Sequence, residues 1–369
     1  MRTVAAVTPA LGEDFIHREV ELDALRPDEV LVRIRAVGIC HTDIAHRDGA
    51  AHFDLPAVLG HEGAGVIEAV GDAVSDLAVG DAVVLSYFAC RTCTSCREHR
   101  PAYCRQSFAG NFAGARPDGS RTLRLDGKEI ASAFFGQSSF AHHAIVAAKG
   151  AVRVGHDLPL STLAPLGCGI QTGAGAVMNT LDLKAGQSLA VFGAGAVGLS
   201  AVMAAKAASA GQIIAIDLSD ERLELARALG ADATYRADQA DLVRAIRKAS
   251  GGGVDAAVEC VGSSDVLQSA FDVLGAGGTA VMLGLPPREA KVAVDMGSLL
   301  GGRRLVGSIE GDADPQVFIP RLIDLHRRGL FPFERLLRFY PFEAINEAVA
   351  DMEAGRTVKP VLLMPETTP

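Results

Sequence analysis

The sequence has no apolar run long enough to cross a membrane, and it has no sustained run of basic residues. A membrane-spanning helix needs about 20 consecutive apolar residues, and a nucleic-acid-binding surface needs clustered lysine and arginine. The 369 residues carry a formal net charge of −9, so neither a membrane nor a nucleic acid is an expected partner. The first residues, Met1–Val4, lead into a strand-like pattern without the apolar core of a signal peptide. A cytoplasmic protein is therefore expected.

Aromatic residues are scarce, at 5%, whereas 49% of the residues are hydrophobic and 21% are charged. This balance is typical of a globular protein with a large core, and the length favours two domains. The cysteines number seven, and four of them lie between Cys90 and Cys104. An odd and clustered set of cysteines, in a reducing compartment, argues against a disulfide framework.

The pattern of apolar residues changes along the chain. Residues 1–160 predict β-structure, with alternation from Val30 to Ala36, a loop over 110–128, and further strands over 59–66, 79–85 and 134–146. From about 170 to 300, short apolar runs alternate with helical segments, which predicts a parallel, doubly wound sheet of the α/β class. Its strands are expected at 187–192, 212–216, 254–259 and 279–283. Helices over 319–328 and 342–353 and a strand over 359–364 are predicted to follow.

A glycine-rich turn joins the first of these strands to a long alanine-rich helix. Gly193 allows a tight turn, Gly195 lets the backbone approach a pyrophosphate, and Gly198 lets the helix pack against the strand. Asp217 ends the second strand, where an acid binds an adenosine ribose and repels the extra phosphate of NADP. The alternative is a packed turn, with Asp217 capping the next helix.

Four cysteines, Cys90, Cys93, Cys96 and Cys104, lie in one short loop-like stretch. Four thiolates without an open position are typical of structural zinc. Neighbouring arginines (Arg91, Arg97 and Arg100) would favour the thiolate forms. An iron–sulfur site is the alternative, although nothing else in the sequence suggests electron transfer.

A second set of metal ligands is spread along the chain. Cys40, His61 and Cys168 each lie within two residues of a glycine, and two thiolates with one imidazole leave a fourth zinc position open, as in a catalytic site. Asp43 and Glu62 are near two of these ligands, and an acid on the free imidazole nitrogen would orient His61. Taken singly, each residue could also have a purely structural role, as a small buried cysteine or as a turn histidine with satisfied hydrogen bonds.

The chain resembles the zinc-dependent medium-chain alcohol dehydrogenases over essentially its full length. The resemblance rests on four motifs: G-H-E-G-A-G-V at 60–66, the cysteines at 90–104, L-G-C-G-I-Q-T-G at 166–173 and G-A-G-A-V-G at 193–198. Within the family it is most similar to the benzyl (aryl) alcohol dehydrogenases. That likeness rests on C-H-T-D at 40–43, F-F-G-Q-S-S-F at 134–140, F-I-P-R-L at 318–322 and F-Y-P-F at 339–342.

The resemblance implies a GroES-like, β-rich catalytic domain over 1–169 and 309–369, with a structural zinc lobe at 88–106, and a Rossmann domain that binds NAD over 170–308. It implies two zinc ions per chain, one catalytic (Cys40, His61 and Cys168) and one structural (Cys90, Cys93, Cys96 and Cys104). It also implies a homodimer, or a tetramer, formed through edge strands around 299–309.

The resemblance further assigns roles to individual residues. Thr42 would take the proton of the bound alcohol, Asp43 would orient the ligand histidine, and Glu62 would be able to approach the zinc. Cofactor contacts are implied for His41, Thr172, Gly193, Gly195, Ala196, Val197, Gly198, Asp217, Arg222 and Lys359. The outer end of the proton relay departs from the family, because Ala45 stands where many relatives have histidine. Either the next residue, His46, reaches the ribose, or the proton leaves through water.

We expect oxidation of a primary aromatic or allylic alcohol to the aldehyde, with hydride transfer to NAD. Tyr87, Phe88, Phe134 and Leu285 are candidates for an apolar substrate pocket, and core packing is the alternative for each. The remaining alternatives are terpene alcohols such as geraniol, a formaldehyde adduct, or a nucleotide-binding protein without catalysis.

Overall fold

The computed structural model describes residues 1–49 and 52–365. The chain forms two compact units. The first consists of Met1–Cys168, Asp314–Pro320 and the chain from Leu336 onward, and the second of Gly169–Ala313 and Arg321–Arg335. The chain passes from the first unit to the second after Cys168 and back after Ala313, and residues 321–335 belong to the second unit. No helix among the described residues is long and apolar enough to cross a bilayer.

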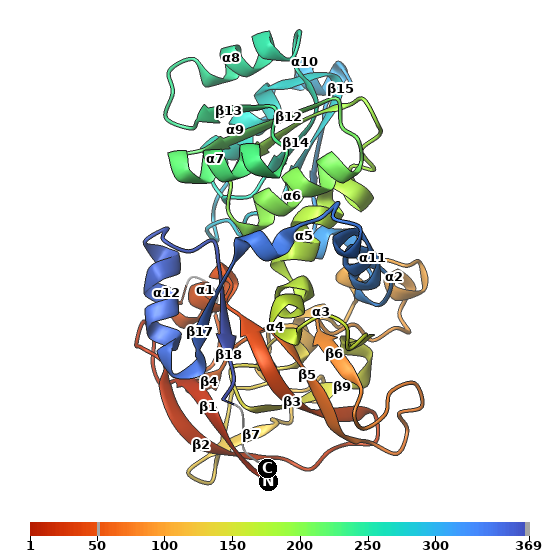
Figure 1. Ribbon diagram of the computed structural model, residues 1–369, viewed down its shortest axis with the longest axis vertical. Coiled ribbons are helices and arrows are strands. Elements are labelled where there is room, and N and C mark those ends of the chain that lie inside the picture. The colour runs from red at the N-terminus through yellow and green to blue at the C-terminus, as the bar shows by residue number, and fades with distance from the viewer. Residues whose placement is uncertain (50–51, 366–369) are drawn as a thin grey trace. The chain divides into compact units, whose positions relative to one another are not determined.

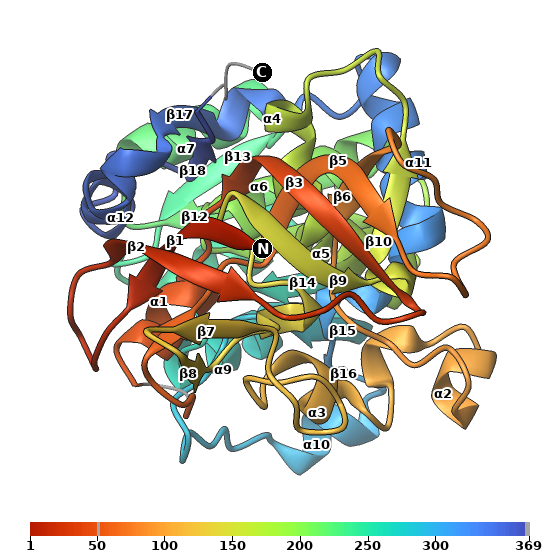
Figure 2. The ribbon, with the colours of Figure 1, turned by 90° about the horizontal axis from the view of Figure 1, so that it is seen from below.

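The first unit contains two sheets whose neighbouring strands are antiparallel, apart from one parallel pair. One sheet has the order β4-β1-β2-β7-β8, and in Figure 2 β1, β2 and β7 lie side by side. Its strands are β1 Arg2–Thr8, β2 Ile16–Leu22, β4 Ala57–Val58, β7 Leu123–Leu125 and β8 Lys128–Ile130. The other has the order β10-β6-β5-β3-β18-β17, with β9 also paired to β3. Its strands are β3 Glu29–Gly38, β5 Glu62–Val70, β6 Ala82–Leu85, β9 His143–Ala147, β10 Ala151–Val154, β17 Leu337–Pro341 and β18 Lys359–Leu363.

The register around β3 gathers distant parts of the chain at one end of this sheet. Glu62 of β5 and Val361 of β18 both pair with Gly38, the last residue of β3. The end of β3 therefore meets the starts of β5 and β18, and helix α1 (His41–Arg47) begins just beyond it. The other helices of this unit are α2 Thr94–Arg97, α3 Ser107–Asn111, α4 Leu160–Leu163 and α12 Ile345–Glu353.

The second unit is a six-stranded parallel sheet of order β13-β12-β11-β14-β15-β16 (Figure 1), so the predicted doubly wound pattern is confirmed. Its strands are β11 Ser188–Phe192, β12 Gln212–Asp217, β13 Ala233–Arg236, β14 Val254–Glu259, β15 Leu274–Met282 and β16 Arg304–Gly307. Its helices are α5 Gly169–Gly175, α6 Ala196–Ala207, α7 Asp220–Leu229, α8 Leu242–Ala249, α9 Ser264–Asp272 and α10 Met296–Leu300, and α11 (Pro315–Arg327) begins in the first unit. Ser219 caps α7 by accepting a hydrogen bond from the Arg222 N–H.

Two predictions of local structure are wrong. The segment 110–128 is not a continuous loop, because Asp126 and Gly127, both with positive φ, join β7 and β8 in a tight hairpin. The segment 134–146 is strand only from His143. Before that strand, Ala133, Phe135 and Ser138 have φ of 55°, 50° and 57°, which folds this part of the chain into a compact turn.

Candidate metal and cofactor sites

Cys40, His61 and Cys168, which are distant in sequence, come together with Glu62 at the end of β3. One ligand atom from each of the four residues lies within 4.8 Å of the others. Cys40 precedes α1, and His61 precedes β5. Cys168 follows Gly167, whose carbonyl oxygen accepts a hydrogen bond of 2.6 Å from Ser86 Oγ at the end of β6. Three separate segments of the chain therefore converge on one cluster.

Asp43 is hydrogen-bonded to three residues in and beside this cluster. Its Oδ2 accepts the Cys40 N–H at 2.9 Å, and its Oδ1 accepts the Gly60 N–H at 3.1 Å and faces His61 Nδ1 at 2.8 Å. Asp43 and His61 have no exposed side-chain surface. Because Nδ1 donates its proton to the carboxylate, Nε2 keeps its lone pair for a metal.

The cluster fits a zinc ion. His61 Nε2 is buried and has no hydrogen-bond partner among the described residues, which is costly unless a ligand takes its lone pair. A hydrogen bond with Cys168 and the charge of Lys359 lower the pKa of Cys40 well below its usual range, although burial opposes this. Burial also disfavours charged His61, but the nearby Asp43 raises its pKa well above the usual value. Two sulfurs and one imidazole nitrogen are a donor set that zinc prefers.

Glu62 and Lys359 form a buried ion pair beside the cluster. The Lys359 Nζ lies 2.6 Å from the Glu62 carboxylate and donates to the Ile39 carbonyl oxygen at 3.0 Å. Burial raises the pKa of Glu62. Burial alone would lower the pKa of Lys359, but the charges of Glu62 and Cys40 raise it instead. Lys359 is only 2% exposed, so in this structure it faces the metal ligands, and a phosphate contact at this residue stays a prediction.

The other predicted residues of this region differ in position. Thr42 is half-buried, with Oγ1 3.7 Å from Cys40 Sγ, and His41 is exposed at the start of α1. His46 does not fit the outer end of a proton relay, because its ring is 4% exposed. Its Nδ1 lies 2.7 Å from the Thr42 carbonyl oxygen, and burial lowers its pKa. One helical turn after Thr42, its side chain lies on the inner face of α1.

Aromatic rings surround the cluster. Phe135 stacks on His61 with ring centroids 4.3 Å apart, and Phe134 meets His61 edge-on at 5.4 Å. Phe112 packs against both phenylalanines and stacks on His46 at 5.8 Å. Sequence reasoning did not find the roles of Phe112 and Phe135, and no periodic pattern marks these residues.

The candidate substrate-pocket residues differ in burial. Phe134 is fully buried and Tyr87 is 4% exposed. Phe88 lines a cavity of about 360 Å³ together with Cys90 and Gln106. Leu285 belongs to the second unit and is 57% exposed. Their contact with substrate stays a prediction.

Gln137 is a further site residue that sequence reasoning missed. Its Nε2 donates to the His61 carbonyl oxygen at 2.9 Å, and its Oε1 accepts the Gly63 N–H at 3.1 Å. The buried amide therefore fixes the backbone on both sides of Glu62. The left-handed turn that precedes β9 places it there.

The four cysteines at 90–104 form a second metal-binding cluster. The sulfurs of Cys93 and Cys96 are 3.5 Å apart, those of Cys90 and Cys96 3.9 Å, and those of Cys93 and Cys104 4.0 Å. Tetrahedral zinc with bonds of about 2.3 Å to sulfur requires separations of about 3.8 Å, so the cluster fits this ion. Burial opposes ionisation of Cys90, but hydrogen bonds from Thr92 and the Cys93 N–H lower its pKa to about 6. Burial and the Cys93 thiol raise the pKa of Cys96 to about 12.

The glycine-rich turn of the second unit has the geometry of a phosphate-binding loop. Gly193 has φ of 93°, and a Cβ at Gly198 would overlap the Gly193 carbonyl oxygen. Helix α6 begins at Ala196 and Val197, where its free N–H groups favour an anion. Asp217 Oδ2 accepts the Ala194 N–H at 2.6 Å, and Arg222 donates to the Ala194 carbonyl oxygen. The turn, the acid and the arginine thus lie together.

Thr172 lies on α5, which packs against the start of α6, since a Cβ at the neighbouring Gly173 would overlap the Val197 carbonyl oxygen. Its Oγ1 is 3.4 Å from the Glu310 carboxylate.

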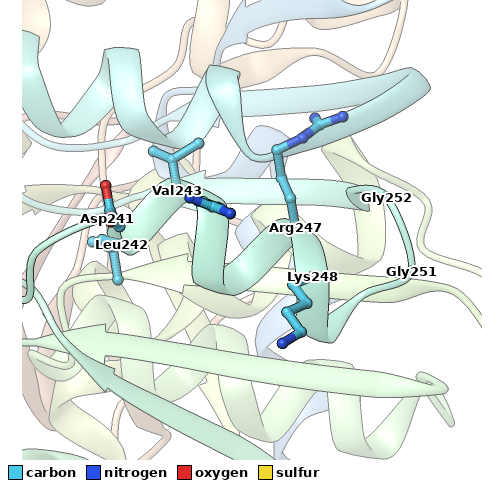
Figure 3. Close-up of a pocket in the computed structure, with 8 residues that line it drawn as sticks. Asp241, Leu242, Val243, Arg247, Lys248, Gly251 and Gly252 are labelled. Carbon is cyan, nitrogen blue, oxygen red and sulfur yellow. The ribbon is translucent and has the colours of Figure 1, made fainter.

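A cavity of about 730 Å³ opens beside α8 (Figure 3), but it contains none of the predicted site residues. Its lining includes Arg244, Arg247 and Lys248. Arg247 already donates to the Asp272 and Leu274 carbonyl oxygens. The cavity therefore lacks the chemistry of the two metal clusters.

Comparison with known proteins identifies the family of the chain. Residues 26–156 match the alcohol dehydrogenase GroES-like domain, and residues 196–326 match the zinc-binding dehydrogenase domain. The chain is 47% identical to geraniol dehydrogenase of Castellaniella defragrans, over 97% of each chain. Two crystal structures superpose closely. One is a zinc-binding-domain alcohol dehydrogenase from Burkholderia ambifaria (TM-score 0.97, 51% identity, 99% of this chain and 100% of that one). The other is benzyl alcohol dehydrogenase from Acinetobacter calcoaceticus (TM-score 0.96, 44% identity, 99% and 100%). The protein therefore belongs to the zinc-dependent medium-chain alcohol dehydrogenases, an enzyme family whose cofactors are zinc and NAD.

Proposed function

We propose that the protein oxidises a primary aromatic or allylic alcohol, of the benzyl alcohol type, to its aldehyde and transfers the hydride to NAD. The observation that carries this proposal is the group of rings beside the cluster of Cys40, His61 and Cys168. Phe134 and Phe135 contact the ligand histidine, and Phe112 packs against both of them; aromatic faces and edges favour a planar, apolar partner. Two similar proteins, a geraniol dehydrogenase and a benzyl alcohol dehydrogenase, are named for an allylic and a benzylic alcohol.

Each residue near the cluster has a separate role in the proposed reaction. Zinc held by Cys40, His61 and Cys168 supplies Lewis acidity, which lowers the pKa of an alcohol hydroxyl. Asp43 fixes the ring of His61, and the Thr42 hydroxyl, beside Cys40, takes the proton that the alcohol loses while it passes its own proton to water. The buried Glu62–Lys359 pair keeps a negative and a positive charge next to the ligands.

NAD is proposed to bind to the second unit. Gly193, Gly195 and Gly198 allow the pyrophosphate to approach the start of α6, and Asp217 favours the adenosine ribose of NAD over the phosphorylated ribose of NADP. NAD held there would supply the acceptor for the hydride that the alcohol carbon loses when it becomes the aldehyde.

Initial rates with NAD and with benzyl alcohol, geraniol and ethanol test the proposal. We expect kcat/KM for benzyl alcohol or geraniol to exceed that for ethanol by about 100-fold or more, and the ratio of the first two separates the benzylic from the terpene alternative. Preference for ethanol would refute the substrate class. A formaldehyde adduct is less favoured because Lys359, the cation beside the cluster, is already paired with Glu62.

We further propose a homodimer that forms through β16. This strand is an edge of the six-stranded sheet. Around it Met296 is 82% exposed, Leu300 91% and Ile309 54%, and such apolar side chains beside an open edge favour pairing with a second copy. Light scattering should give a dimer or a tetramer of the 38.4 kDa chain. A Leu300→Glu variant should dissociate, and a monomeric parent protein would refute the proposal.

A further inference from the structure

Glu259, the last residue of β14, is a buried acid without a cationic partner in the described chain. Its Oε1 accepts the N–H groups of Val261 and Gly262, each at 2.7 Å. Its Oε2 is buried and has no hydrogen bond among the described residues. Burial raises the pKa of Glu259, and hydrogen bonds from backbone N–H groups, those of Val261 and Gly262 foremost, oppose this shift. A buried carboxyl that costs stability and pairs with no cation marks a candidate functional position.

The two loops after β14 and β15 touch at Glu259. The carbonyl oxygen of Glu259 accepts the Leu283 N–H at 2.8 Å and the Gly284 N–H at 3.2 Å. A Cβ at Gly284 would overlap the backbone of Gly262, so only glycine allows the loops to approach so closely. One residue therefore holds the first loop through its side chain and the second through its backbone.

These loops present apolar side chains at the carboxyl edge of the sheet. Val261 is 54% exposed and Leu285 is 57% exposed. Val261 also packs over the glycine-rich turn, since its Cγ2 lies 2.9 Å from where a Cβ of Gly193 would be. Exposed apolar groups here can cover a flat ring.

The strand order shows which half of a dinucleotide these loops would meet. β11, which leads into the glycine-rich turn, lies between β12 and β14. Asp217 ends β12, so the adenosine belongs on that side, and the nicotinamide falls on the side of β14 and β15. Phe192, just before the turn, pairs in register with Glu259.

We propose that Glu259 is a positioning residue for the nicotinamide half of NAD, because it holds Val261 and the two loops in the shape that receives the ring. This inference rests on the proposed binding of NAD to the second unit. Glu259 acts through the loop backbone and need not touch the cofactor.

The test compares NADH with ADP-ribose, which lacks the nicotinamide. NADH binding is followed by its fluorescence and ADP-ribose binding by calorimetry, using the full-length zinc-loaded protein. Glu259→Ala should weaken NADH about tenfold or more, and ADP-ribose less than about twofold. Glu259→Gln should restore most of the NADH affinity, because its amide oxygen can still accept both N–H groups.

Equal weakening of both ligands by Glu259→Ala, or no weakening of either, would overturn the inference. If the alanine variant does not fold, Val261→Ala decides: it removes the apolar side chain that Glu259 is proposed to hold, so it should weaken NADH more than ADP-ribose, and equal effects count against the proposal. If the parent protein binds neither ligand, the proposal that NAD binds to the second unit is refuted, and this result is distinct from a failure of the role proposed for Glu259.

Discussion

The Asp43 carboxylate lies 2.8 Å from His61 Nδ1, and both side chains are fully buried. The same carboxylate also accepts the backbone N–H groups of Cys40 and Gly60. A single acid therefore sets the position of two metal ligands, one through its ring and one through its backbone.

We expect Asp43→Asn to lower zinc affinity or kcat/KM by about 10- to 100-fold. The carboxylate accepts hydrogen bonds from three N–H groups, and the amide NH₂ group of asparagine, itself a donor, would face at least one of them. Zinc retention against a chelator and kcat/KM together measure this effect. Asp72→Asn, at an exposed position, is the matched control. Unchanged zinc retention and rate in the Asp43 variant would show that the acid does not orient the ligand.

Cys93→Ser should remove the metal of the four-cysteine cluster alone. The zinc content should fall from about two to about one per chain, and the melting temperature should fall with it, because the loops at 90–104 lose their cross-link. Elemental analysis and thermal unfolding measure the two effects. Cys260→Ser changes a cysteine outside both clusters and should keep both ions. Two zincs in the Cys93 variant would contradict the structural assignment.

Asp217→Asn should shift the choice of dinucleotide. The amide can still accept the Ala194 N–H, but it no longer repels a ribose phosphate. We expect the ratio of kcat/KM for NAD to that for NADP to fall by about tenfold or more. Glu224→Gln removes one negative charge from an exposed position on α7 and controls for net charge. A constant ratio in the Asp217 variant would place the selectivity elsewhere.

Asp351 on α12 should contribute pH-dependent stability. Hydrogen bonds from Tyr340 Oη at 2.7 Å and from Arg356 at 2.8 Å lower its pKa. A lowered carboxyl pKa stabilises the fold above the unfolded value of about 3.9, and this contribution is lost as the pH falls through the folded pKa. Asp351→Asn should therefore lower the melting temperature at pH 7, and the difference should shrink below about pH 4.

Melting curves between pH 3 and 8 measure this difference. Glu347→Gln, an exposed position on the same helix, should show no such change with pH. A difference for Asp351→Asn that stays constant over this range would mean that the stabilisation does not come from the ionised carboxyl.

The sequence was most informative where function depends on neighbouring residues. The four cysteines lie in one short segment, and the glycines at 193–198 lie directly between a strand and a helix, so spacing alone predicts both sites. The alternation of strands and helices over 188–282 is equally local, and its predicted type was confirmed with limits that shifted by a few residues.

What could not be predicted depends on long-range register and on strained backbone. Lys359 reaches Glu62 because β18 and β5 both pair with β3, and no local pattern encodes that pairing. Phe135 stacks on His61 because a residue other than glycine takes a left-handed conformation, against its own preference. Whether the His46 side chain lies on the inner or the outer face of α1 depends on the residue at which α1 begins. The sequence alone fixes that residue only to within one or two positions.

The two metal clusters differ in how much chain each one needs, and this sets an order during synthesis on the ribosome. The ligands from Cys90 to Cys104 leave the ribosome almost together, so that cluster can take up its ion while most of the chain is still unmade. The cluster of Cys40 and His61 must wait for Cys168, and its buried ion pair must wait for Lys359 in the last strand. We expect a nascent chain arrested after about residue 130 to hold one zinc, and the catalytic site to be completed only after release.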